Sequence, residues 1–335
     1  MRWLAAVGLC SLVLAAGRLS AAADAEALVQ QAQQIFGVLP AEAQSDANPL
    51  TPAKIDLGRM LYYDARLSPG QGLSCNGCHD LARYGGDHAP ASPGHRGERP
   101  RNAPATYNAA LQFAQLWDGR APSVEDAAAV LDGAPEVLRA IPGYQVAFRA
   151  AFPEDADPIV PANAARALGA FQRRLVTPAR FDRFVQGDTA ALTSEEQQGL
   201  QTFIATGCPG CHHGATVGGQ MFQKLGVVEP YPTEDRGRAA VSGNPADEYV
   251  FKVPSLRNVA ETAPYFHDGS VETLDMAVRL MARFQIGRTL TDEETASIVA
   301  FLRSLTGELP KDTSAPPELP PSGAQTPGPD GPKPG

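Results

Sequence analysis

The sequence predicts a mainly α-helical protein that contains two similar halves. In each half a helix signal is followed by a short glycine-rich turn and then by the run Cys-x-x-Cys-His, once at residues 75–79 and once at residues 208–212. Apolar residues recur at helical spacing ahead of both runs and again near the carboxyl end. The chain therefore repeats one helical unit and adds a final helix.

Each predicted helix has a recognisable start. Thr51-Pro52 places proline at the first helical position, and Ser194 is the predicted cap of the helix before the second cysteine pair. Thr291 and Glu294 form a capping box for the last helix. The apolar faces of these helices consist of Leu57, Met60 and Leu61; Leu200, Phe203 and Ile204; and Ile298, Phe301, Leu302 and Leu305, before Gly307 ends the last one.

Length and composition limit the function classes. A chain of 335 residues is long enough for about two domains, and an apolar fraction of 43% allows packed cores. The formal net charge of −9 argues against a nucleic-acid-binding protein, which would present a basic surface.

The amino terminus predicts a cleavable export signal, residues 1–23. Arg2 supplies a basic start, residues 4–16 are apolar, and Ala21-Ala22-Ala23 are the small residues of a cleavage site. The apolar stretch is shorter than the ~20 residues of a membrane-spanning helix, although a retained anchor is the alternative. Cleavage would remove Cys10, the fifth cysteine.

The remaining chain divides into three parts. A linker near residues 176–188 separates an N-terminal domain, 24–185, from a C-terminal domain, 186–309. The last segment, 310–335, holds nine prolines in 26 residues and has no periodic apolar pattern, so we expect a disordered, solvated tail. A role in docking a partner is the alternative for this tail.

The four remaining cysteines predict two covalently bound haem groups. Cys75-Cys78-His79 and Cys208-Cys211-His212 both match Cys-x-x-Cys-His, the signature of c-type haem attachment, in which two thiols bind one porphyrin and the histidine binds its iron. Two disulfides or a zinc site are the competing interpretations, but each pair has its own histidine. The predicted fold class is thus mainly α, with two c-type cytochrome domains, each built around one haem.

The second axial ligand of each iron would decide between an electron carrier and a catalyst. His95 lies in a Gly/Pro-rich loop and is a candidate ligand of the first haem, with His88 as its competitor. His213 follows a proximal ligand directly and must point elsewhere. Met276 and Met281 share a predicted helix, residues 274–284, where methionine more often fills a core.

Taken together, these residues resemble the bacterial dihaem cytochrome c peroxidases, which are related to the dihaem maturation enzymes of methylamine utilisation. The resemblance covers about Pro49 to Gly307. Besides the first haem motif with its preceding Gly72-Leu73-Ser74, the runs that carry it are Arg101-Asn102-Ala103-Pro104, Leu116-Trp117-Asp118-Gly119-Arg120-Ala121, Phe181-Asp182-Arg183-Phe184, Phe251-Lys252-Val253-Pro254-Ser255-Leu256-Arg257-Asn258-Val259-Ala260 and Thr262-Ala263-Pro264-Tyr265-Phe266-His267.

The resemblance implies roles for individual residues. The family's displaceable histidine stands in a Gly-His pair sixteen residues after the first proximal histidine, which is His95 here (95 − 79 = 16). The tryptophan between the haems matches Trp117, and the methionine ligand of the second haem matches Met281, while Met276 keeps a core role. The family's calcium ion would be bound by three residues, Asn102, Thr262 and Pro264.

Two positions depart from the family pattern. Ala127 stands where the family has a glutamine, ten residues after the tryptophan. The family's distal glutamate lies in a P-V-E-M-like run, whereas this chain reads Pro135-Glu136-Val137-Leu138, so Glu136 is one place out of register. Glu136 is the predicted general acid–base of the peroxide site, and a surface role is the alternative.

The function that the resemblance implies is reduction of hydrogen peroxide to water in the periplasm. The electrons would come from a small c-type cytochrome or a cupredoxin, enter at the haem of His212 and Met281, and reach the first haem past Trp117. The family also suggests a homodimer. Two other functions stay open: a non-catalytic dihaem electron carrier, and a dihaem oxidase that modifies a partner protein, although that relative has tyrosine in place of Met281.

Overall fold

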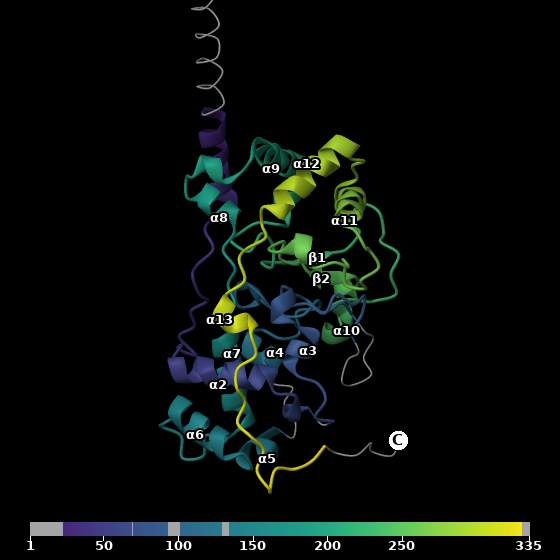
Figure 1. The fold of residues 1–335 in the computed structure, drawn as a ribbon. Coiled ribbons are helices and arrows are strands. Elements are labelled where there is room, and N and C mark those ends of the chain that lie inside the picture. The colour runs from purple at the N-terminus through teal and green to yellow at the C-terminus, as the bar shows by residue number, and fades with distance from the viewer. Residues whose placement is uncertain (1–22, 69, 93–100, 129–133, 330–335) are drawn as a thin grey trace, which may run out of the picture.

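The computed structural model describes residues 23–68, 70–92, 101–128 and 134–329 (Figure 1). His95 and residues 1–22 of the predicted export signal lie outside these ranges. Within the described part of the chain, no helix combines the length and apolarity needed to cross a bilayer.

The fold is mainly helical, as the sequence predicts. Residues 23–35 form a first helix. The further helices are α2 (Pro52–Tyr63), α3 (Cys75–Cys78), α4 (Val124–Ala128), α5 (Ala134–Arg139), α6 (Pro142–Ala151), α7 (Pro161–Gln172), α8 (Arg180–Val185), α9 (Ser194–Thr206), α10 (Ala239–Ser242), α11 (Leu274–Met281), α12 (Asp292–Arg303) and α13 (Lys311–Ser314). Two short antiparallel strands, β1 (Phe222–Lys224) and β2 (Val250–Lys252), pair Phe222 with Lys252.

One helix crossing holds each half of the molecule together. α2 crosses α7 in the lower half of Figure 1, and α9 crosses α12 in the upper half. A Cβ atom added to Gly58 would lie 1.9 Å from the Ala167 carbonyl oxygen, and one added to Gly199 would lie 1.8 Å from that of Ser297. Glycine is therefore needed at both crossings because the backbones touch there.

The helix starts follow the predictions with one correction. Thr51 caps α2 by accepting a hydrogen bond from Lys54 N, and Thr291 with Glu294 forms the capping box of α12. The cap of α9 is Thr193 and not Ser194, because the Thr193 hydroxyl accepts from Glu196 N and the Glu196 carboxylate accepts from Thr193 N. Two adjacent hydroxyl residues made these alternatives hard to separate from sequence.

The buried side chains form two main clusters, one in each half. The first contains α2, α6 and α7, with Leu57, Phe148 and Phe171 fully buried. The second surrounds α9 and α12, but it also contains residues 28–36 and α8. Figure 1 shows the N-terminal helix beside α8 at the upper half. These two segments, which the sequence assigned to the N-terminal domain, thus pack with the C-terminal core.

A segment of about thirty residues occurs twice, with a constant offset of 150 positions (258 − 108). Asn108 and Asn258 both have positive φ and both begin a 3-10 helix, Ala109–Leu111 or Val259–Glu261. Isolated bridges then join Gln115 to Ala121 and Tyr265 to Val271. Trp117 and His267 therefore occupy equivalent positions in the two copies, and so do the first residues of α4 and α11.

The predicted disorder of the proline-rich tail is wrong for residues 310–329. This segment begins with α13 and runs along the α2–α6 half as an extended chain (Figure 1). Its carbonyl oxygens accept hydrogen bonds from side chains of that half: Ala315 from Arg59, Pro320 from Arg66 and Pro327 from Gln71. A proline-rich segment can be ordered without an apolar core when its free carbonyl groups find donors.

Gly199→Ala is expected to destabilise the protein by about 1–3 kcal/mol, because the added methyl group meets the Ser297 carbonyl oxygen. In an open helix the same change would stabilise by ~1 kcal/mol. Gln198→Ala on the exposed side of α9 is the matched control. Denaturant unfolding of the holoprotein measures both, and a Gly199→Ala variant at least as stable as the parent would contradict the close crossing.

Candidate functional site

The second Cys-x-x-Cys-His run lies directly after α9. The helix ends at Gly207, whose φ of 94° is the left-handed conformation that favours glycine. A 3-10 turn, Cys208–Gly210, follows, and the amide groups of Cys211 and His212 both donate to the Cys208 carbonyl oxygen. The turn therefore places both cysteines and the histidine on one short, tightly bonded loop.

A cavity of about 400 Å³ opens beside this loop. Cys208, Cys211 and His212 line it from one element, and Met281 lines it from the end of α11. Most other side chains around these four are apolar, among them Phe203, Leu256, Leu274, Val278, Ile298 and Leu302. The structure thus brings the predicted proximal histidine and the predicted methionine ligand into one apolar cavity.

Burial keeps the polar groups of this loop neutral. It lowers the pKa of His212 to about 4, against the opposing influence of the Val217 and Pro254 carbonyl groups, and it raises the pKa of Cys208 to about 12. These carbonyl groups lie near the ring, but the buried Nδ1 atom of His212 forms no hydrogen bond with any described residue. A neutral imidazole is the form that binds a metal ion.

The first Cys-x-x-Cys-His run has similar features. Cys75–Cys78 forms the single turn α3, and His79 ends it. Tyr62 on α2 donates a hydrogen bond of 2.7 Å to the His79 carbonyl oxygen and so fixes the loop to the helix. The Nδ1 atom of His79 is also buried, with no hydrogen-bond partner among the residues that the structure describes, and burial lowers the pKa of this imidazole. It also raises the pKa of Cys75 to about 11.

The described residues fit haem better than the two competing groups. All four described cysteines are free, which leaves the disulfide interpretation without support. In the described ranges, no three His, Cys, Asp or Glu side chains are close enough to hold a metal ion, as a zinc site would require. Paired thiols next to a buried, neutral imidazole are what an attached haem needs, and at the second motif an apolar cavity adjoins them.

The candidates for the other axial positions lie in different places. His95, the predicted ligand of the first haem, is outside the described residues. His88 lines the cavity, but its Nε2 atom lies 3.0 Å from the Arg83 carbonyl oxygen. His213 points elsewhere, as expected, with Nδ1 3.3 Å from the Pro209 carbonyl oxygen. Met276 is 49% exposed, so its predicted core role is wrong.

The two copies of the repeated segment meet at Trp117 and His267, whose ring centroids are 6.3 Å apart. The contact is reciprocal: Asn102 N donates to the His267 carbonyl oxygen (2.9 Å), and Lys252 N donates to the Trp117 carbonyl oxygen (2.8 Å). Trp117 Nε1 also donates to the Asn102 carbonyl oxygen (2.9 Å). Trp117 lines the cavity of Met281 and is therefore held between the two halves.

The three predicted calcium ligands come together along the same cavity. Asn102, Thr262 and Pro264 all line it, and Asn102 Nδ2 lies 3.4 Å from the Pro264 carbonyl oxygen. The bond between Ala263 and Pro264 is cis. Carbonyl and amide oxygens are ligands that suit calcium. Here the amide nitrogen of Asn102 faces the Pro264 carbonyl oxygen, and calcium binding stays a prediction.

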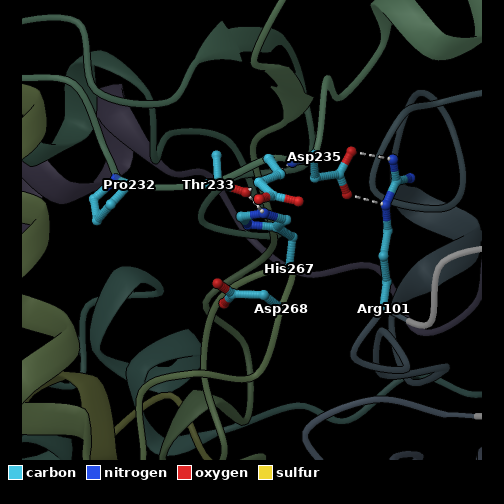
Figure 2. Close-up of a pocket in the computed structure, with 7 residues that line it drawn as sticks. Arg101, Pro232, Thr233, Asp235, His267 and Asp268 are labelled. Carbon is cyan, nitrogen blue, oxygen red and sulfur yellow. Dashed lines mark hydrogen bonds and ion pairs between the residues drawn. The ribbon is translucent and has the colours of Figure 1, made fainter.

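A second, open pocket of about 560 Å³ is lined by His267 together with Arg101, Thr233 and Asp235 (Figure 2). His267 is buried, and its Nε2 atom lies 3.0 Å from the Thr233 hydroxyl group. Figure 2 shows Asp235 in two contacts with Arg101, at 2.6 and 2.8 Å. His267 thus lines both the surface pocket and the inner cavity.

The side chain of Glu136, in the first turn of α5, is exposed. The described cavity lies beside the second motif, so the role of Glu136 at the first haem stays a prediction. Sequence reasoning also missed two inward residues, His267 and Lys252, which line the cavity and are buried. The signal that could have found them is the 150-position repeat, in which they match Trp117 and Asn102.

Comparison with known proteins gives consistent matches. Residues 52–190 match the family model of di-haem cytochrome c peroxidase. The chain is 40% identical to cytochrome c551 peroxidase of Pseudomonas aeruginosa, over 86% of this chain and 89% of that protein. It is 39% identical to the cytochrome c551 peroxidase of Nitrosomonas europaea, over 94% and 95%.

A solved structure agrees with these sequence matches. A MauG-like protein associated with microbial copper homeostasis is 29% identical, with a TM-score of 0.73 over 84% of this chain and 97% of that one. With two relatives near 40% identity along most of their length, the chain belongs to the di-haem cytochrome c peroxidase family.

Proposed function

We propose that this protein carries two covalently attached haems and reduces hydrogen peroxide to water. The proposal rests on one apolar cavity. His212 and Met281 both line this cavity, and it extends to Trp117 at the contact between the halves. The two relatives near 40% identity are both named cytochrome c551 peroxidase, which supports the same activity for this chain.

The haems would supply the redox chemistry, and the chain's own residues hold and tune them. Cys75 and Cys78 would bind the first haem and Cys208 and Cys211 the second, with His79 and His212 as proximal ligands. The N-terminal domain, 24–185, would then contain the first haem and the C-terminal domain, 186–309, the second. A thioether ligand raises the reduction potential of its haem, so the Met281 side is the proposed electron-entry site.

Trp117 and His95 have different proposed tasks. Trp117 lies at the contact between the halves and is held by its bond to Asn102, so it would offer a fixed path for electrons from one half to the other. His95 would be a displaceable ligand of the first haem, and its movement away would make room there for peroxide. Two electrons and two protons convert each peroxide into two water molecules.

Glu136 is proposed as the proton carrier on the grounds of the family resemblance alone. It would accept the proton of the peroxide oxygen next to the iron and return it to the leaving oxygen. Its exposed side chain and Ala127 in place of the family's glutamine favour the second candidate function, a dihaem electron carrier without turnover. Met281 argues against an oxidase that modifies a partner protein.

Calcium, location and partners complete the proposal. Asn102, Thr262 and Pro264 would hold one calcium ion at the contact between the halves, which would strengthen the junction around Trp117. The export signal would place the protein in the periplasm, where a small c-type cytochrome or a cupredoxin would donate electrons. The assembly would be a homodimer, as in the family that the sequence resembles.

Met281→Leu is expected to lower the more positive of the two midpoint potentials, because the thioether ligand that stabilises the reduced iron is lost. Met276→Leu, an exposed methionine on the same helix, is the control and should change neither potential. Spectroelectrochemical titration measures both. Unchanged potentials in the Met281→Leu protein would remove this residue as a ligand.

Turnover should require the half-reduced protein. With a reduced small cytochrome as donor, we expect peroxide consumption only after one electron has been added, together with a change of the first haem from low spin to high spin. His95→Gly should give the high-spin signal in the fully oxidised protein. No turnover with both haems low spin would instead support the electron carrier.

Glu136→Gln is expected to lower turnover by about 10²–10⁴-fold if this group carries the proton, as general acid–base catalysts contribute that much. Glu154→Gln, another exposed carboxylate, is the control. Steady-state peroxide assays compare the two. Full activity of the Glu136→Gln protein would show that Glu136 has only a surface role.

A further inference from the structure

The repeat relates the proposed calcium ligands to a second set of residues on the opposite side of the contact. An offset of 150 positions (252 − 102) pairs Asn102 with Lys252 and Thr262 with Gln112. The structure agrees, because Asn102 N and Lys252 N make the two reciprocal hydrogen bonds between the halves. Asn102 and Thr262 would surround a cation with oxygen atoms, whereas the equivalent set contains the ammonium group of Lys252.

Lys252 is buried and lines the inner cavity. Its ammonium group donates to the side-chain oxygen of Gln112, which is a neutral acceptor. No carboxylate of the described residues forms an ion pair with it. Arg257, the other deeply buried cation nearby, is by contrast fully paired with Asp182 through two contacts of 2.6 and 2.8 Å.

A buried ammonium group without a counter-charge is costly, since transfer from water disfavours its charged form. Burial alone lowers the pKa of Lys252 to about 8, and the group still carries most of its charge at neutral pH. The cost would be offset by an anionic group in the cavity. A haem brings two propionate carboxylates, and it is the anion that this cavity is proposed to receive.

The second haem is the one within reach of Lys252. Two residues after Lys252, the Pro254 carbonyl group lies beside the His212 ring. On the paired strand β1, Gln223 lies next to Phe222, the partner of Lys252, and its Nε2 atom is 3.9 Å from Cys211 Sγ. The pairing of β1 with β2 therefore holds Lys252 close to the loop that carries the second haem motif.

We propose that Lys252 is a fixed cation that binds a propionate of the haem attached at Cys208 and Cys211. It would provide for the second half the positive charge that a calcium ion would provide for the first half. This inference rests on the proposed haem attachment. A cation near the iron favours the reduced state, so Lys252 would also help to keep this haem the more positive of the two.

The test compares Lys252→Met with Lys252→Arg in the purified holoprotein. Lys252→Met should lower the midpoint potential of the Met281-side haem and move its propionate bending band in the resonance Raman spectrum, whereas Lys252→Arg should keep the potential close to that of the parent. Lys252→Gln, which keeps a polar side chain, replaces Lys252→Met if that variant does not accumulate.

Lys311→Met is the matched control, because it removes the same charge from an exposed position on α13 that does not line the cavity. It should leave both potentials unchanged. An unaltered potential and propionate band in Lys252→Met, or a shift confined to the first haem, would overturn the inference. Protein without haem bands would contradict the proposed function itself, so the two failures are distinguishable.

Discussion

The reciprocal contact between the two copies of the repeated segment is the constraint on which the rest of the site depends. Asn102 N bonds to the carbonyl oxygen of His267, and Lys252 N bonds to that of Trp117. These bonds fix both aromatic rings and align the cavity of Met281 with the first half. If the halves moved apart at this contact, the proposed path for electrons through Trp117 would be lost.

The sequence could predict much of the fold because several signals are local. The capping box of α12, the proline at the start of α2 and the two haem motifs each depend on a few adjacent residues. The proline-rich tail was not predictable in this way. Its order depends on donors from Arg59, Arg66 and Gln71, some 250 residues earlier in the chain, and composition does not report such partners.

In the candidate site, too, some residues could be predicted from the sequence, whereas others depend on contacts between distant parts of the chain. The family resemblance indicated Trp117 and Met281, and both residues line one cavity in the structure. Nothing in the local sequence distinguishes Lys252 from a surface lysine. Its burial results from the pairing of β2 with β1 and from the contact of its side chain with Gln112 in the other half. Only the repeat connects it to Asn102. The buried positive charge of Lys252 at the contact therefore depends on how the two copies of the segment fold together. Neither copy alone predicts it.

The most direct test of the central claim is near-infrared magnetic circular dichroism of the oxidised holoprotein, combined with a count of haems per chain. Two covalently attached haems per chain are expected, one of which gives the charge-transfer band of histidine–methionine ligation. One haem per chain, or two haems that both lack a methionine ligand, would rule out the proposed site.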